Sequence, residues 1–168
     1  VALRATVSMS VRLSPRCVLD IGCGEGWLTD ALEGHGIPTV GTDAIPALLA
    51  FARQHRKGRF IQLDYDQLDQ LTQGKRFDLA VCNFSLIGKE STETVFRAVH
   101  SLLQPGGYFV VQTLHPVEAC GDQPYADGWR PGSWEGFSQA FRQPAPWYFR
   151  TMESWRALFQ EHGLPLTH

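Results

Sequence analysis

Three glycines at alternate positions, Gly22, Gly24 and Gly26, directly follow an apolar run at residues 17–21. Glycine allows a sharp backbone turn and lets a ligand approach the chain without meeting a Cβ atom. An apolar run that ends in such a loop is typical of the first strand-to-helix turn of an α/β domain. The dinucleotide-binding fingerprint carries its third glycine one residue later. The spacing therefore disfavours a nicotinamide oxidoreductase, and a purely structural turn stays open as an alternative.

The rest of the chain alternates short apolar runs with amphipathic stretches, which predicts βαβ units and a parallel sheet. The expected fold is an α/β three-layer Rossmann-like sandwich with a mostly parallel sheet. Strands are expected at residues 17–21, 38–42, 59–63, 77–82 and 108–114, with a turn at residues 105–107. Helices are expected at residues 1–13, 26–34, 46–56, 65–73, 92–103 and 151–162, the last capped by Thr151.

The composition disfavours several classes of protein. A formal net charge of -2 disfavours a protein that binds nucleic acid through a broad basic surface. The chain has no apolar run of about 18 residues and opens on no secretory signal, so no membrane span is expected. The four cysteines show no C-x-x-C spacing, and no metal site is expected. Cysteines beside apolar runs indicate reduced thiols in a cytoplasmic protein.

Polar residues recur where the expected strands end. The second to fifth strands are followed by Asp43, by Asp64, by residues 83–85 (Asn-Phe-Ser) and by His115, as the first is followed by the glycine loop. In an open α/β sheet, ligands bind beyond the carboxyl ends of the strands. These five points therefore predict one crevice that holds a ligand.

Residues 18–26 (Val-Leu-Asp-Ile-Gly-Cys-Gly-Glu-Gly) resemble motif I of the class I S-adenosylmethionine (SAM)-dependent methyltransferases. The resemblance continues in order through residues 40–43, 60–64, 77–83 and 103–107 and covers about residues 15–115. It implies SAM as the cofactor, S-adenosylhomocysteine as its product, and a small-molecule methyl acceptor. The cofactor-binding residues that it implies are Asp20, Gly22, Cys23, Gly24, Gly26, Asp43, Ala44, Asp64, Tyr65, Asn83 and Phe84.

The resemblance also implies a role for most of these residues. The glycine loop would lie against the methionine and ribose portions of SAM, with Asp20 orienting the loop and reaching the cofactor amino group directly or through water. Asp43 would accept both ribose hydroxyls, since a carboxylate accepts two hydrogen bonds at once. Asp64 and the Tyr65 amide would bind adenine. Ordinary roles stay open for these residues, such as a helix cap for Asp43 and a turn for Asn83.

Methyl transfer from a sulfonium is an in-line displacement, so positioning supplies most of the acceleration. A base is needed only when the nucleophile arrives protonated, and His115 is the candidate for it. The candidate substrate-binding residues are Trp129, Trp147, Tyr148 and Arg150, because aromatic rings offer rigid apolar walls. A structural histidine and an aromatic cover over the sheet are the alternatives.

We expect one domain at residues 1–168, with a cofactor-binding core at 1–115 and an aromatic-rich substrate or lid segment at 116–150. Residues 151–168 would form a C-terminal helix and the start of a strand. The family's sheet has seven strands, so its C-terminal antiparallel hairpin is expected to be missing or incomplete here. The fifth strand would then be an exposed edge, which favours pairing with another chain; the oligomeric state stays open, and a dimer is one possibility.

Two other functions stay open from the sequence. The first is a methyltransferase that acts on RNA or protein. Residues 83–86 (Asn-Phe-Ser-Leu) argue against methylation of bases in nucleic acid, because they lack the Pro-Pro pair typical of those enzymes. The second is a non-catalytic SAM-binding or interaction subunit, which the intact glycine loop and Asp43 disfavour.

Overall fold

The computed structural model describes residues 2–72, 76–132 and 145–166. Its elements, in chain order, are α1 (Ala2–Arg12), β1 (Val18–Ile21), α2 (Trp27–Gly34), β2 (Thr39–Asp43), α3 (Pro46–His55), β3 (Arg59–Gln62), the 3₁₀ helix η1 (Tyr65–Thr72), β4 (Phe77–Asn83), α4 (Lys89–Leu102), β5 (Leu103–Gln112), α5 (Pro116–Cys120), β6 (Gly128–Arg130), β7 (Trp147–Phe149) and α6 (Met152–Glu161).

The central sheet has five strands in the order β3-β2-β1-β4-β5, and every neighbouring pair is parallel. The strand order reverses at β1, which pairs with both β2 and β4. Ligands of such sheets bind at the point where the order reverses. The fold class predicted from the sequence is confirmed, and the crevice lies where the glycine loop leaves β1.

Alternate residues of the central strands pack on opposite faces of the sheet. Val18, Leu79 and Val81 are fully buried against residues of α1 and α2. Leu19 and Ile21 point the other way, into a larger core with η1, α4 and α6. Burying both faces of a parallel sheet explains why these strands are near-continuous apolar runs in the sequence.

Strand β5 begins earlier than the sequence indicates. Leu103 pairs with Phe77, and the register then shifts so that Tyr108 pairs with Leu79. The expected turn at residues 105–107 lies inside this strand as an irregularity, where Gly106 has a φ of +77°. Pro105 cannot donate to a strand ladder, and Gly106 allows this positive φ. These two residues therefore bend the strand rather than end it.

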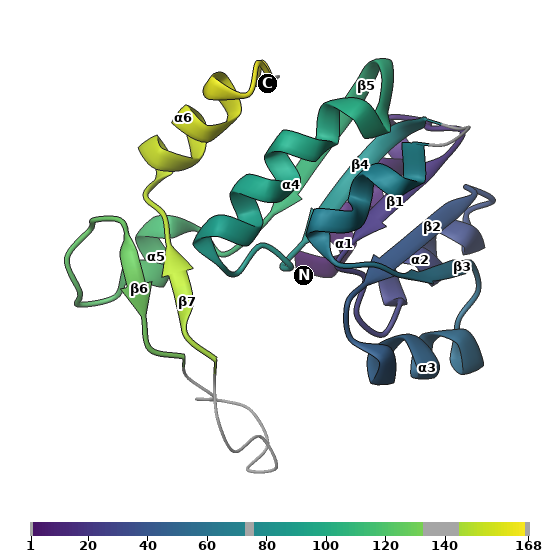
Figure 1. Ribbon diagram of the computed structural model, residues 1–168, viewed down its shortest axis with the longest axis horizontal. Helices are drawn as coiled ribbons and strands as arrows, with labels where there is room; N and C mark the ends of the chain where they lie inside the picture. Colours follow the sequence, from purple (N-terminus) through teal and green to yellow (C-terminus); the bar gives the residue numbers. More distant parts are fainter. Residues whose placement is uncertain (1, 73–75, 133–144, 167–168) are drawn as a thin grey trace.

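Between β5 and α6 the structure has three short elements that were not predicted from the sequence. Helix α5 follows β5, and β6 and β7 pair antiparallel in a separate two-stranded sheet. Figure 1 shows this hairpin and α6 beyond β5, on the side of the molecule away from α3. Strands of three residues are too short to display a periodicity, so their sequence resembled a long loop.

In the part of the chain that the structure describes, no strand pairs with the outer edge of β5. Residues 164–166 form no strand, and residues 167–168 of the expected C-terminal strand lie outside the described residues. Among the described helices, none combines the length and apolar character that a membrane crossing requires.

Candidate functional site

The glycine loop turns through three left-handed positions, with φ of +73° at Gly22, +54° at Gly24 and +75° at Gly26. A Cβ atom on Gly22 would lie 2.4 Å from Ser85 Cβ, and one on Gly26 would lie 2.5 Å from the Phe60 ring. A Cβ atom on Gly24 would meet nothing within 4 Å. Side chains therefore pack against Gly22 and Gly26, whereas Gly24 faces open space.

Asp43 joins this loop to the end of β2. Its Oδ2 accepts a hydrogen bond of 2.9 Å from the Gly24 amide, and its Oδ1 accepts one of 2.9 Å from the Ile45 amide. A carboxylate has about four acceptor sites, so each oxygen keeps a further lone pair. Ala44 is exposed beside it. Asp43 thus both shapes the loop and presents acceptors beside the open face of Gly24.

Asp20 lies beneath the loop rather than in the open crevice. Its side chain is 1% exposed, and its Oδ2 accepts a hydrogen bond of 2.9 Å from the Thr29 hydroxyl of α2. Burial raises the pKa of Asp20 from its ordinary 3.8 to about 7, although the Thr29 hydrogen bonds oppose that shift. Asp20 therefore braces β1 against α2, directly under the residues that turn.

The Cys23 thiol also points away from the opening. It is buried in a small cluster with Leu49, Ala52 and Phe60. Burial raises its pKa, so the thiol stays protonated. The Cys23 amide donates a hydrogen bond of 2.9 Å to the Thr42 carbonyl. The side chain of this predicted cofactor-binding residue therefore serves packing.

A polar hollow of about 390 Å³ lies between the ends of β2 and β3. Ala44, Gln62, Asp64, Asp66 and Gln67 line it. Asp64 of the predicted adenine-binding pair lies here, and its Oδ1 accepts a hydrogen bond of 2.6 Å from the Tyr65 amide. That amide is thus already paired, and a base bound here would share or displace the Asp64 contact.

Ser85, which the sequence placed with Asn83 at the predicted crevice, joins two loops at this edge of the sheet. Its hydroxyl donates to the Ile21 carbonyl at 2.7 Å, and the Tyr65 hydroxyl donates to its carbonyl at 2.9 Å. Ser85 also lies closest to the space that Gly22 leaves empty. It therefore locks the loop after β4 onto the loop after β1.

Asn83 and Phe84 follow β4 at the same edge. Asn83 Oδ1 accepts a hydrogen bond of 2.9 Å from the Thr6 hydroxyl, which ties α1 to the crevice. Phe84 has a φ of +53° and a ring that is 38% exposed. Its amide donates to the Gln112 carbonyl at 2.8 Å. A bulky residue held in left-handed backbone is typical of a functional site.

This strain makes Phe84→Gly more stable than Phe84→Ala, by about 1 kcal/mol in the free energy of unfolding. Both variants lose the ring, but only glycine adopts the positive φ freely. Ile87 is not among the positive-φ residues and serves as the control. There we expect Ile87→Ala to be more stable than Ile87→Gly. Urea titration of the four variants measures both differences, and equal stability of the two Phe84 variants would contradict the strain.

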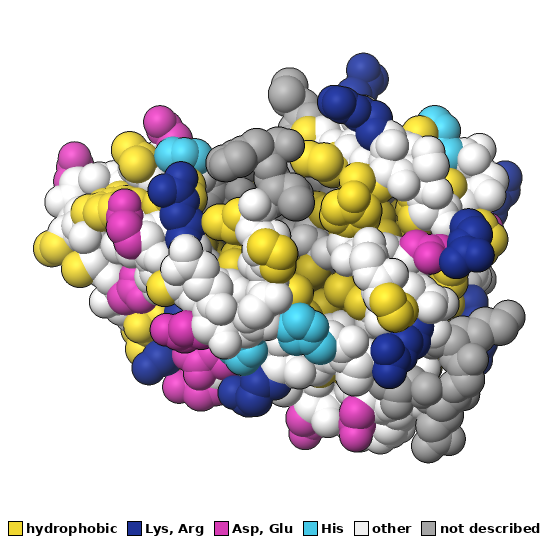
Figure 2. Space-filling view, turned by 90° about the horizontal axis from the view of Figure 1, so that it is seen from above, with side chains coloured by type: hydrophobic (Ala, Val, Ile, Leu, Met, Phe, Trp, Pro, Cys, Tyr) yellow, Lys and Arg dark blue, Asp and Glu magenta, His cyan; other side chains and the backbone are white. Residues whose placement is uncertain are grey.

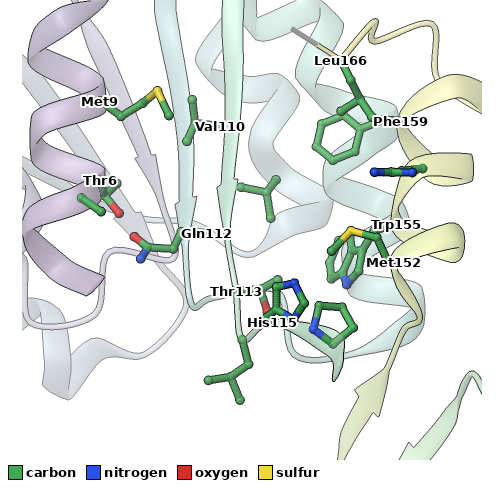
Figure 3. Close-up of a pocket in the computed structure, with 15 residues that line it drawn as sticks. Thr6, Met9, Val110, Gln112, Thr113, His115, Met152, Trp155, Phe159 and Leu166 are labelled. Carbon is green, nitrogen blue, oxygen red and sulfur yellow. The ribbon is translucent and has the colours of Figure 1, made fainter. Parts of the chain in front are cut away.

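His115 lies at the mouth of an apolar trough along the open edge of β5. Hydrophobic side chains line a hollow at the middle of the face in Figure 2. The trough measures about 450 Å³ and runs between α1 and α6, with Met9, Val110 and Phe159 among its walls. Figure 3 shows the His115 ring on the α6 side, near Met152 and Trp155. His115 is exposed and caps α5 with its backbone.

The four predicted substrate residues lie on or next to the β6–β7 hairpin. Trp129 and Tyr148 face each other across it, with ring centroids 5.6 Å apart. The Tyr148 amide donates to the Ile87 carbonyl at 2.8 Å. The hairpin is thus fastened to the loop after β4, three residues beyond Phe84, while Trp147 packs against Phe149.

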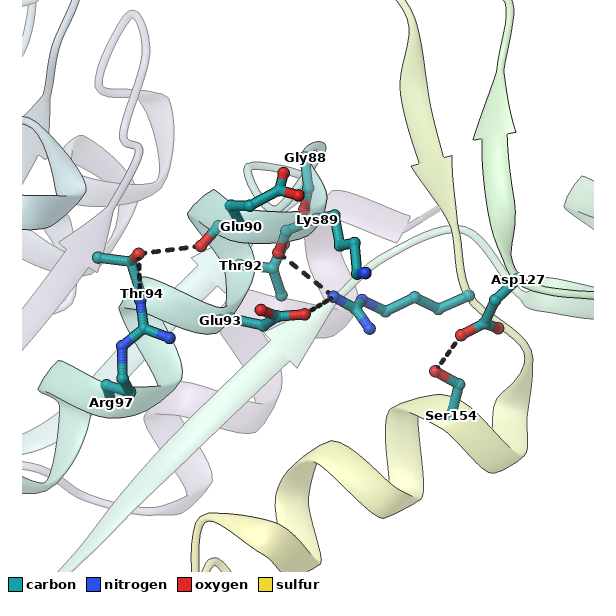
Figure 4. A network of polar contacts seen from close by, with 10 residues as sticks. Gly88, Lys89, Glu90, Thr92, Glu93, Thr94, Arg97, Asp127 and Ser154 are labelled. Carbon is teal, nitrogen blue, oxygen red and sulfur yellow. Dashed lines mark hydrogen bonds and ion pairs between the residues drawn. The ribbon is translucent and has the colours of Figure 1, made fainter.

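Arg150 differs from the other three because its charge is already paired. Its guanidinium is buried and contacts Glu93 Oε1 and the Lys89 carbonyl, both at 3.3 Å (Figure 4). It also lies over the rings of Tyr148 and Trp155. Arg150 therefore fixes β7 and α6 onto the start of α4. Within the described residues, no group of three metal-ligating side chains gathers at a point.

A family model described as a methyltransferase domain matches residues 3–168. The ubiquinone biosynthesis O-methyltransferase of Pseudomonas paraeruginosa (strain DSM 24068 / PA7) is 34% identical over 107 residues, which cover 61% of this chain and 46% of that protein. The Coxiella burnetii (strain Dugway 5J108-111) protein of the same name is 28% identical over 112 residues, or 65% and 48% of the two chains. The chain spans about half the length of these relatives.

Two solved structures share the fold. The SAM-dependent methyltransferase from Mesorhizobium loti has a TM-score of 0.70 at 24% identity, over 100% of this chain and 83% of its own. The Burkholderia thailandensis 1,6-didemethyltoxoflavin-N1-methyltransferase has a TM-score of 0.68 at 21% identity, over 96% and 66% of the two chains. The family model confirms the resemblance of motif I, and the two structures show that the fold is that of SAM-dependent methyltransferases: the chain belongs to the methyltransferase-domain family.

Proposed function

We propose that this domain transfers the methyl group of SAM to a small-molecule acceptor. The observation that carries the proposal is the pairing of an open Gly24 with an Asp43 carboxylate that keeps free acceptor sites beside it. A ribose in this space presents its two hydroxyls to Asp43, and only a residue without Cβ leaves the space clear. The named relatives are O-methyltransferases of ubiquinone biosynthesis, which favours a small-molecule acceptor.

The other predicted residues take roles that their surroundings allow. The polar hollow beside Asp64 suits the adenine, and Asn83 and Phe84 face the methionine end. Asp20 is 1% exposed, so it acts on the cofactor through the loop that it supports. Bound SAM supplies an activated methyl group whose carbon–sulfur bond breaks as the bond to the acceptor forms. The chain's task is to place the acceptor in line with that bond.

His115 is the proposed base for an acceptor that arrives protonated. It is exposed at the end of β5, next to the loop after β4. The proton leaves the acceptor oxygen or nitrogen for the imidazole, or for water where the nucleophile is already free of it. If the acceptor needs no base, the kcat of His115→Ala should stay close to that of the wild type.

Titration calorimetry with SAM tests the proposal on Asp43. Asp43→Ala removes both ribose acceptors and the Gly24 contact, and hydrogen bonds to a charged group contribute about 1.5–3 kcal/mol each. We expect SAM affinity to fall at least about 100-fold in Asp43→Ala. Asp43→Asn keeps one carbonyl oxygen for the loop, so its loss should be about tenfold. Glu153→Gln, an exposed change on α6, is the matched control.

Each outcome of this titration decides something. Micromolar SAM binding that follows this order, with no NADH binding, supports the cofactor assignment. Equal SAM affinity of the wild type and Asp43→Ala would overturn the role of Asp43. A folded protein that binds no SAM at all would overturn the proposed function.

A further inference from the structure

The side chain of Tyr65 connects two loops that the sheet keeps apart. Tyr65 follows β3, and its hydroxyl donates a hydrogen bond of 2.9 Å to the Ser85 carbonyl, in the loop after β4. The strand order β3-β2-β1-β4 places two strands between these loops (Figure 1). This hydrogen bond therefore links the end of the crevice proposed for adenine to the end proposed for methionine.

A third loop meets the other two beside the Tyr65 hydroxyl. The Ser85 hydroxyl donates a hydrogen bond of 2.7 Å to the carbonyl of Ile21, the last residue of β1. A Cβ atom on Gly22 would lie 2.8 Å from the Tyr65 oxygen and 2.9 Å from Ser85 Oγ, so both hydroxyls pack against this glycine. The position of the loop after β4 therefore depends on two hydrogen bonds, one from Tyr65 and one to Ile21.

The segment that Tyr65 holds contains the strained backbone of Phe84, whose φ is +53°. A bulky residue stays in such a conformation only where its surroundings fix it. The Gln112 carbonyl accepts a hydrogen bond from the Phe84 amide on one side of the strained position. Ile21 and Tyr65 hold Ser85 on the other side. Without the Tyr65 hydroxyl, the Ser85 carbonyl loses a partner, and residues 84–85 are free to relax toward ordinary backbone.

The ring and the hydroxyl of Tyr65 make separate contacts. The ring packs against the buried core that contains Leu68 and Leu86. Burial raises the pKa of the hydroxyl, which therefore stays protonated and able to donate. Phenylalanine keeps the ring in the core and removes only the donor, so Tyr65→Phe isolates the contribution of the hydroxyl.

We propose that Tyr65 is a positioning residue of the proposed methyl transfer, whose hydroxyl holds the Phe84–Ser85 segment against the methionine half of SAM. This inference rests on the proposed function, and the hydroxyl acts on the cofactor only through that segment. The contacts proposed for ribose and adenine belong to Asp43 and Asp64, and the Tyr65 amide that contacts Asp64 is kept in phenylalanine. Loss of the hydroxyl should therefore weaken binding of the methionine half and leave the adenosine half unchanged.

Two ligands that differ only in the methionine half test the proposal by titration calorimetry. S-adenosylhomocysteine carries the amino acid, whereas 5′-methylthioadenosine keeps the adenosine and the sulfur without it; the second is titrated directly or by displacement of the first. In Tyr65→Phe we expect S-adenosylhomocysteine affinity to fall about three- to tenfold, as for one hydrogen bond, and 5′-methylthioadenosine affinity to change less than about twofold. Tyr108→Phe makes the same change at a tyrosine that is 43% exposed and should alter neither affinity.

A second variant tests whether the effect passes through Ser85. Ser85→Ala removes the hydrogen bond to Ile21 and should show the same selective loss of S-adenosylhomocysteine affinity. Because either change releases the same segment, the double variant should lose less affinity than the product of the two single losses. Single losses that multiply in the double variant would show that Tyr65 acts independently of Ser85, contrary to the proposal.

The two ligands also separate this proposal from the one it rests on. Equal losses of both affinities in Tyr65→Phe, or no loss of either, would rule out the positioning role and leave the proposed function standing. A wild-type protein that binds neither ligand fails at the cofactor step, which overturns both proposals. Unchanged 5′-methylthioadenosine affinity in Tyr65→Phe shows that the variant has folded, so that its loss of S-adenosylhomocysteine affinity reports on the segment.

Discussion

Gly22→Ala is expected to lower the free energy of unfolding by about 3 kcal/mol or more. The left-handed φ of +73° costs an alanine about 1–2 kcal/mol. Its Cβ atom would also lie 2.4 Å from Ser85 Cβ and 2.8 Å from the Tyr65 hydroxyl. Overpacking of this kind costs about 1–3 kcal/mol. Burial raises the pKa of the Tyr65 hydroxyl, which stays protonated and holds Ser85 in place, so the contact has little room to relax.

Gly24→Ala is the matched comparison, because the change is the same but the space above Gly24 is open. We expect a loss of only about 1–2 kcal/mol in stability, from the φ of +54° alone. Its Cβ atom enters the space proposed for SAM, so SAM binding should be lost although the fold survives.

Urea unfolding and SAM calorimetry on both variants measure this contrast. The expected pattern is an unstable Gly22→Ala and a folded Gly24→Ala that does not bind SAM. Equal stability of the two variants would contradict the packing of Ser85 over Gly22. Wild-type SAM affinity in Gly24→Ala would contradict the placement of the cofactor.

The glycine loop and the strand ends beside it could be predicted from local signals in the sequence. The apolar run of β1 and the glycines after it are contiguous in the chain, and a left-handed turn needs glycine wherever it occurs. Asp43 was identified because it ends a strand, and parallel strands bring their ends to one edge. The position of Gly24, open between two packed glycines, required the structure.

The surroundings of the other predicted residues depend on partners that are distant in the chain. Arg150 was a candidate for substrate binding, but its partner Glu93 lies 57 residues away in the chain. Asp20 was expected to orient the loop and to reach the cofactor directly or through water, and the alternation along β1 turns its side chain toward Thr29 of α2. The hairpin gave no periodic signal, and its fastening through Tyr148 and Ile87 joins segments that no pattern connects.

Asp20→Asn is expected to remove a pH dependence of stability between about pH 4 and pH 7. Asp20 has a pKa of about 7 in the folded chain because burial disfavours its charge, against 3.8 ordinarily. Between these values the folded state holds a proton that the unfolded state releases, so this group stabilises the fold at low pH. The contribution of Asp20 to the free energy of unfolding falls as the pH rises toward 7 and is constant above that pH. A shift of this size corresponds to a few kcal/mol.

Unfolding of the wild type and Asp20→Asn at pH 5 and pH 8 isolates this contribution. Asparagine is neutral at both pH values and keeps a carbonyl oxygen for Thr29. From pH 5 to pH 8 the free energy of unfolding of the variant should therefore rise by a few kcal/mol relative to that of the wild type. Asp78 does not obscure the result: Arg16 lowers its pKa, so its contribution disappears only below about pH 4. A difference between the two proteins that stays constant from pH 5 to pH 8 would show that Asp20 is ionised in the fold. The loop would then rest on a buried charge, which the cationic sulfonium of SAM would favour directly.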